Sequence, residues 1–221
     1  MSGNKPGSPG EARASGATVA QILSSDLRPA PQPLLDSCYD FLGDEDIPFS
    51  RYTSRAFFDS EIDGLWNRAW QWACREEHLQ DIGDTYVYDV GPYSIIVVRS
   101  DTDTIQAFIN SCTHRGTRIL AAQGSGYSAG FTCPFHGWSW HLNGEIDNIP
   151  ARWDFPHVDQ ERHGLQAVHC ERWGGFVFIN MDPAARPLAE YLAVLPAHFA
   201  HFAHFPLERR RIRVHVEKIL P

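Results

Sequence analysis

The chain has 221 residues, of which 43% are hydrophobic and 21% charged, so it can bury a core and still present a polar surface. Its formal net charge of −8 would repel nucleic acid. The five cysteines are unevenly spaced, which does not suit a small secreted disulfide scaffold, and no apolar run approaches the roughly 20 residues that span a bilayer. We therefore expect a cytoplasmic protein with no membrane span and no nucleic-acid partner.

The first part of the chain has the composition of a tail. Residues 1–35 are rich in Gly, Ser, Ala and Pro and contain no aromatic side chain, so they cannot bury much apolar surface. We predict a disordered or extended N-terminal tail over residues 1–46, within which residues 19–27 are a candidate for a short docking helix.

A helical pattern follows this tail. From Ser54 onwards, apolar side chains recur at intervals of three and four, which is typical of one face of a helix with Ser54 as its N-cap. The side chains of this face are Phe58, Ile62, Leu65, Trp66, Ala69 and Trp70. We expect this helix to pack on a large, aromatic surface.

After Gly83 the sequence changes to short β-branched and aromatic runs separated by turn residues. The runs cover residues 86–90, 93–99, 104–110, 130–133, 138–141 and 176–180. They predict an antiparallel β region of six or more strands, followed by a second helical pattern between Pro183 and Pro206. The fold class predicted from the sequence is therefore α+β, mainly antiparallel β with a lead-in helix.

Two short motifs in the β region carry metal-binding side chains. Cys112 and His114 lie in the first motif, Cys133 and His136 lie in the second, and 18 residues separate His114 from Cys133. If the two loops meet tip to tip, they supply two thiolates to one iron and two imidazoles to another, as a Rieske [2Fe–2S] cluster requires. We predict that these four residues bind such a cluster.

Gly116 and Gly137 follow the two pairs, and they allow backbone amides to approach the cluster sulfurs. A structural zinc site is the alternative, because two cysteines and two histidines also satisfy tetrahedral zinc. Zinc fingers usually group Cys with Cys and His with His, whereas each motif here mixes them. A Rieske cluster has a potential of roughly −150 to +300 mV, against about −400 mV for plant-type ferredoxins, which suits electron delivery to an oxygen-activating metal.

The motifs Cys-x-His-Arg-Gly and Cys-Pro-x-His-Gly-Trp resemble the Rieske domain of aromatic-ring-hydroxylating oxygenase α subunits. The likeness extends over about residues 47–221 and includes the run from Gly174 to Asn180. It implies that Trp138 packs beside the cluster and that Arg115 braces the ligand loops. It also implies that the imidazole edges of His114 and His136 face the path by which the electron leaves.

The same resemblance implies a larger redox system. A reductase or a ferredoxin would deliver electrons from NAD(P)H to the cluster, and these would pass to a mononuclear Fe(II) in a neighbouring subunit of a trimer. The complete enzyme would hydroxylate an aromatic or related substrate with O2, in the catabolism of aromatic hydrocarbons.

The mononuclear iron of this family is held by two histidines and a carboxylate, and no segment of this sequence matches that motif. The histidines at positions 198, 201 and 204 are spaced by threes and do not resemble it. We therefore expect residues 47–182 to form the lead-in helix and the Rieske domain, and residues 183–221 to begin a truncated catalytic domain. We expect no catalytic residue in this chain, and no hydroxylation by it alone.

Two other functions remain open at this stage. A standalone carrier of the Rieske ferredoxin type would need less chain than this, and a zinc-stabilised binding module would have no redox activity. Respiratory Rieske proteins typically carry an extra cysteine in each ligand loop, where this sequence has Thr117 and Phe135. Cys38, Cys74 and Cys170 lie away from both loops and are expected to be ordinary thiols.

Overall fold

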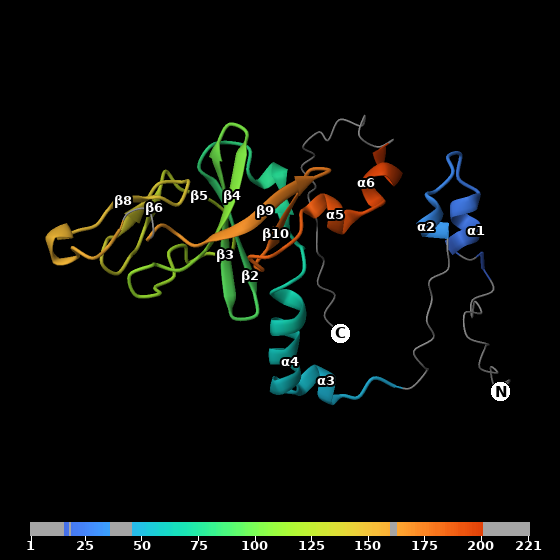
Figure 1. Cartoon of the computed structure of the whole chain (residues 1–221), viewed down its shortest axis with the longest axis horizontal. Helices are drawn as coiled ribbons and strands as arrows, with labels where there is room; N and C mark the ends of the chain where they lie inside the picture. Colours follow the sequence, from blue (N-terminus) through green and yellow to red (C-terminus); the bar gives the residue numbers. More distant parts are fainter. Residues whose placement is uncertain (1–15, 18, 36–45, 160–162, 201–221) are drawn as a thin grey trace, which may run out of the picture.

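The structure is a computed structural model, and it describes residues 16–17, 19–35, 46–159 and 163–200. This part of the chain is mainly antiparallel β with short helices (Figure 1). Its strands are β1 (Gln71–Arg75), β2 (Asp84–Val90), β3 (Tyr93–Asp101), β4 (Thr104–Ile109), β5 (Gly124–Tyr127), β6 (Phe131–Thr132), β7 (Ser139–Trp140), β8 (Ile146–Asn148), β9 (Ala167–Trp173) and β10 (Phe176–Asn180). The predicted fold class is confirmed.

The strands form two sheets. The larger has seven strands in the order β1-β10-β9-β4-β3-β2-β5, and the smaller has three in the order β6-β7-β8. Every pair of neighbouring strands is antiparallel. Four strands lie outside the six expected runs, namely β1, β5, β8 and β9. In β5 the reason is composition, because a Gly-Ser-Gly-Tyr run pairs with β2 through its backbone without the side chains that mark a strand.

The helices are short. They are α1 (Val19–Ser24), α2 (Gln32–Leu35), α3 (Ser50–Thr53), α4 (Arg55–Glu61), α5 (Leu188–Leu192) and α6 (Leu195–His198), with a π-helical turn at Ile62–Trp66 and 3-10 turns at Glu76–His78 and Arg152–Asp154. Helix α1 lies within the candidate docking helix at residues 19–27. The rest of the tail prediction concerns residues 1–15 and 36–45, which lie outside the described residues.

The lead-in helix is shorter than the apolar pattern indicated. The Ser54 hydroxyl accepts a hydrogen bond from the Phe57 amide at 3.2 Å, which confirms the N-cap. After α4 the chain widens into the π-helical turn, whose only buried residue is Ile62. Ile62 packs against Gly91 in the β2–β3 turn, where a Cβ would have no room. The prediction of one helix running to Trp70 is therefore wrong, since the helical turns end at Trp66 and Trp70 already leads into β1.

Strand β3 holds the two cores of the molecule together. Residues Ile95, Ile96, Val97 and Val98 are all 0% exposed, so this strand is covered on both faces. Because alternate side chains point to opposite faces, Ile96 and Val98 enter one core while Ile95 and Val97 enter the other. The first core also contains Cys112, Cys133 and the small sheet, so the two predicted ligand loops rest directly on this strand's packing.

Figure 1 shows the small sheet and its loops at one end of the molecule, away from α5 and α6. On the other side of the larger sheet, Leu188 and Leu192 of α5 pack on Trp70, with Trp173 and Phe178 beside them. The helical pattern after Pro183 is thus confirmed as far as His198. Residues 201–221, which include His201, His204 and the larger part of the segment 183–221 expected to begin a truncated catalytic domain, lie outside the described residues. Among the residues that are described, no helix has the length and apolar character needed to cross a membrane.

One turn of the small sheet depends on the absence of a side chain. Gly144 has φ +84°, and a Cβ there would lie 2.5 Å from the buried ring of Phe108. Gly124 has a similar φ of +88°, but a Cβ there would meet nothing within 4 Å. The two positions therefore share the backbone requirement and differ in the space available.

We predict that Gly144→Ala lowers the free energy of unfolding by about 2–4 kcal/mol, because strain at positive φ and overpacking of Phe108 add together. The matched variant Gly124→Ala is expected to lose only about 1 kcal/mol, from the backbone alone. Chemical denaturation of the two variants beside the parent protein measures the difference. Equal losses in the two variants would contradict the packing argument at Phe108.

Candidate metal centre

The two predicted ligand loops have the same backbone geometry. The Gly116 amide donates to the Cys112 carbonyl at 2.8 Å, and the Gly137 amide donates to the Cys133 carbonyl at 3.1 Å. Both glycines have φ +73°, a conformation that costs other residues energy. The cysteine amides also match, since Cys112 donates to the Thr117 carbonyl and Cys133 to the Trp138 carbonyl, each at 2.8 Å. The two loops therefore form the same type of turn, and in each the glycine lies four positions after the cysteine.

Each turn directs backbone amides at a sulfur. The thiol of Cys112 accepts from the amides of His114 and Arg115. The thiol of Cys133 likewise accepts from the amides two and three positions on, and from the hydroxyl of Thr117 across the gap between the loops. The two thiols also hydrogen-bond to each other, so the loops do meet at their cysteines.

The two thiols differ in acidity. Burial raises the pKa of Cys112 above its ordinary value. Burial also opposes ionisation of Cys133, but the amide and hydroxyl donors around it outweigh burial and lower its pKa. Both cysteines are buried, with 4% of the Cys112 residue and 2% of the Cys133 residue exposed. Such a site favours one thiolate charge more than two, unless a cation neutralises the second.

The two imidazoles form the second pair of the site. The ring centroids of His114 and His136 lie 4.9 Å apart. The Nδ1 atom of His114 is buried and has no hydrogen-bond partner within the described part of the chain, which is a costly state for a polar nitrogen. Burial, with the charges of His136 and Arg115 nearby, lowers the pKa of His114 and so favours its neutral form. A neutral imidazole with an unpaired buried nitrogen is what a metal ligand requires.

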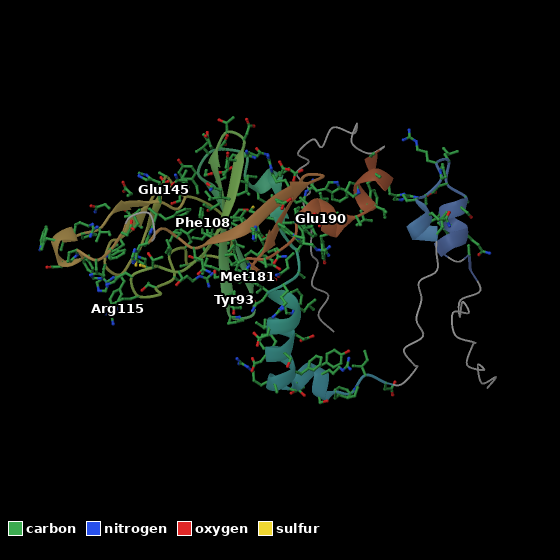
Figure 2. All side chains as sticks on the ribbon, in the orientation of Figure 1. Tyr93, Phe108, Arg115, Glu145, Met181 and Glu190 are labelled. Carbon is green, nitrogen blue, oxygen red and sulfur yellow. The ribbon has the colours of Figure 1, made fainter. Side chains whose placement is uncertain are left out.

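The aromatic neighbours of this pair are asymmetric. Trp138 is 3% exposed and stacks on His114, with centroids 4.8 Å apart and planes inclined by 4°. His136 is exposed, and its near neighbour is the ring of Phe135 at 3.8 Å. The guanidinium of Arg115 lies over that Phe135 ring at 5.8 Å, which joins the first loop to the second. Figure 2 shows Arg115 at the outer end of the molecule on the side of the small sheet, far from Glu190 of α5.

The predicted site residues therefore come together, in two pairs. Gly116 and Gly137 both have positive φ, which favours glycine, and a Cβ at either would meet no protein atom closer than 3.4 Å. That they let backbone amides approach the sulfurs of a bound cluster stays a prediction. Thr117 and Phe155 were missed as neighbours of the ligands. Thr117 was noted only as a position without cysteine, and Phe155 has no sequence signal because 40 residues separate it from His114.

The remaining cysteines that the structure describes, Cys74 and Cys170, are free thiols and lie in the other core. Burial raises the pKa of each to about 12, so both are ordinary buried thiols at neutral pH, as expected. Cys38 lies outside the described residues. Within the described ranges, no group of three or more His, Cys, Asp or Glu side chains is arranged about a single ion. The two ligand cysteines form one pair and the two ligand histidines form another, which is the arrangement that a binuclear cluster uses.

Comparison with known proteins agrees with this geometry. The family model of the Rieske [2Fe-2S] domain matches residues 69–159. The oxygenase subunit of carnitine monooxygenase from Escherichia coli is 30% identical over 68% of this chain and 40% of its own length. The alpha subunit of biphenyl 2,3-dioxygenase from Rhodococcus jostii is 32% identical over 64% of this chain and 31% of its own length.

A solved structure of the quaternary ammonium Rieske monooxygenase CntA, in complex with gamma-butyrobetaine, is also similar. It superposes with a TM-score of 0.64 at 28% identity, over 70% of this chain and 44% of that chain. The chain thus spans less than half the length of each of these relatives. The assignment is the same from the fold, from the paired cysteines and histidines, and from the similarity to these known proteins. The chain carries the Rieske [2Fe–2S] domain of a Rieske non-haem iron oxygenase α subunit.

Proposed function

We propose that Cys112 and Cys133 hold one iron of the cluster and that His114 and His136 hold the other, so that this chain relays single electrons. The observation that carries the proposal is the buried Nδ1 of His114, which has no hydrogen-bond partner among the described residues and lies beside a second imidazole, together with the pairing of the two thiols. When bound, a Rieske cluster accepts and releases one electron at a potential well above that of an all-cysteine cluster.

The protein contributes hydrogen bonds to this chemistry. The amides of both turns and the Thr117 hydroxyl donate to the two cysteine sulfurs, where they offset the negative charge that reduction adds. Trp138 and the surrounding core exclude water from the sulfurs. The ring of His136 is exposed, so it is the ligand edge through which a partner protein can exchange electrons most directly.

We propose that the donor is a reductase or ferredoxin and that the acceptor is a mononuclear non-haem iron that activates O2. The proposal rests on relatives that are oxygenase subunits, and the trimer and the division at residues 47–182 and 183–221 remain proposals with it. The names of these relatives divide between an aromatic substrate, biphenyl, and quaternary ammonium substrates. An electron-relay domain serves both classes, so the role proposed here is not restricted to aromatic catabolism.

The other two functions are less well supported. The named relatives favour an oxygenase subunit over a standalone carrier, and the family model favours an iron–sulfur cluster over zinc. Iron and acid-labile sulfide analysis of the purified chain distinguishes the cluster from zinc.

Replacing His136 by Cys is expected to lower the reduction potential towards the roughly −400 mV of all-cysteine clusters, or to abolish assembly, because a third thiolate adds negative charge. The control is His141→Cys, at an exposed histidine of the β7–β8 turn whose ring pairs with Asp147 at 3.6 Å. Potentiometric titration followed by visible absorption gives the values. A parental potential in the His136 variant would refute the ligand assignment.

Replacing Thr117 by Val removes the hydroxyl that donates to Cys133 while keeping the shape of the side chain. The potential is expected to fall by roughly 40 mV, since this corresponds to about 1 kcal/mol for one electron and one hydrogen bond. Thr113→Val is the matched control, because the Thr113 hydroxyl donates to the His163 carbonyl at 2.9 Å instead of to a sulfur. Equal shifts in the two variants would argue against the hydrogen bond to sulfur.

A further inference from the structure

A third segment of the chain contacts both ligand loops. Residues 150–158, which we call the cover segment, follow β8 and lie outside the two predicted motifs. A Cβ on Gly137 would lie 3.4 Å from Pro150, so the start of the segment abuts the second ligand loop. Phe155, further along, contacts the first loop at His114, with centroids 5.4 Å apart.

Phe155 stands across the stacked rings of the site. Its plane is inclined by 84° to the His114 ring and by 88° to the Trp138 ring, whose centroid lies 5.3 Å away. Perpendicular aromatic contacts of this kind are favourable and directional. The stack and the perpendicular ring together restrict rotation of the His114 imidazole, whose Nδ1 has no protein partner to fix it among the described residues.

Arg152 holds Phe155 in this position. Its Nη1 donates to the Phe155 carbonyl and its Nη2 donates to the Val158 carbonyl. Val158 is 5% exposed and belongs to the same core as the ligand cysteines. A guanidinium can reach two carbonyls with one rigid planar group, whereas the ammonium of lysine is a compact point donor. The fork of Arg152 therefore ties the backbone of Phe155 to the core.

The backbone of the cover segment is held in an uncommon conformation. Ala151 has φ +53° and ψ +46°, in the left-handed region that residues with a Cβ rarely adopt. The turn after it is closed by the Asp154 amide donating to the Ala151 carbonyl at 2.8 Å. A strained turn persists only where its surroundings fix it, and Arg152 and Val158 supply that restraint here.

The imidazoles of His114 and His136 therefore differ in the aromatic rings that pack against them. His114 is covered by Trp138 and Phe155, both packed on the core. His136 contacts Phe135, which is itself 59% exposed. A change at Phe155 or Arg152 should thus act mainly on His114.

We infer that the cover segment orients the His114 imidazole for the cluster, with Arg152 as a positioning residue that acts through Phe155. The inference rests on the cluster assignment proposed above. It makes the retention of the iron and the electronic environment of one histidine depend on a side chain that touches neither.

The test uses the purified 221-residue chain and its variants Arg152→Lys and Phe155→Leu. Phe155→Tyr keeps the ring, and Trp153→Ala alters an 80% exposed neighbour in the same turn. We expect Arg152→Lys and Phe155→Leu to release iron to a chelator about 2- to 10-fold faster, the range that loss of one aromatic contact produces. In the reduced state, pulsed electron paramagnetic resonance should show an altered ¹⁴N coupling for one of the two histidines. Phe155→Tyr and Trp153→Ala should match the parent.

The double variant Arg152→Lys/Phe155→Leu tests whether Arg152 acts through Phe155 or whether the two residues affect iron release independently. If Arg152 acts through Phe155, the double variant releases iron no faster than Phe155→Leu alone. Failure of Phe155→Leu to assemble a cluster that Phe155→Tyr does assemble would also support the inference. Parental release rates and ¹⁴N couplings in both single variants, or additive effects in the double variant, would overturn it. A parent without a cluster would instead overturn the proposed function, and this inference with it.

Discussion

The geometry of the candidate cluster site depends on two turns, each of which needs a residue with positive φ four positions after a cysteine. Gly116 and Gly137 close the turns, and this closure points backbone amides at the sulfurs of Cys112 and Cys133. Because the amides are fixed by the turn, they are already in place when a cluster gains negative charge, and little reorganisation accompanies the change. The histidines follow at fixed distances along each turn, so the sulfur geometry sets the position of the imidazoles as well.

The turns need a rigid base, and the doubly covered strand β3 provides it. One of its faces supports the core that contains the ligand cysteines, and the other supports the core of the larger sheet. The ligand loops thus pack on a strand whose central residues are fully buried, while His136 is exposed. Burial of the sulfurs and exposure of one imidazole are consequences of the same packing, and together they suit a centre that exchanges electrons with other proteins without admitting water.

The ligand motifs could be predicted from the sequence because their chemistry is local: cysteine, histidine and glycine stand within a few positions of each other. The strand runs with β-branched residues could be predicted for the same reason. Strand β5 could not, since its Gly-rich sequence is ordered only by its partner β2. The contacts of Phe155 could not either, because they arise from a segment that folds back over the site. Apolar spacing in the lead-in helix misled the prediction, because Phe58, Leu65 and Trp66 of that face are exposed and Ile62 is the only buried residue of the π-helical turn.

The central claim is that this chain holds a [2Fe–2S] cluster with two cysteine and two histidine ligands. Low-temperature electron paramagnetic resonance of the anaerobically purified, dithionite-reduced chain, combined with iron and sulfide analysis, tests it most directly. The account predicts a rhombic signal of the Rieske type, with iron and sulfide in equal amounts and ¹⁴N coupling from histidine. A silent spectrum from a chain that contains stoichiometric zinc, or a signal without histidine coupling, would contradict it.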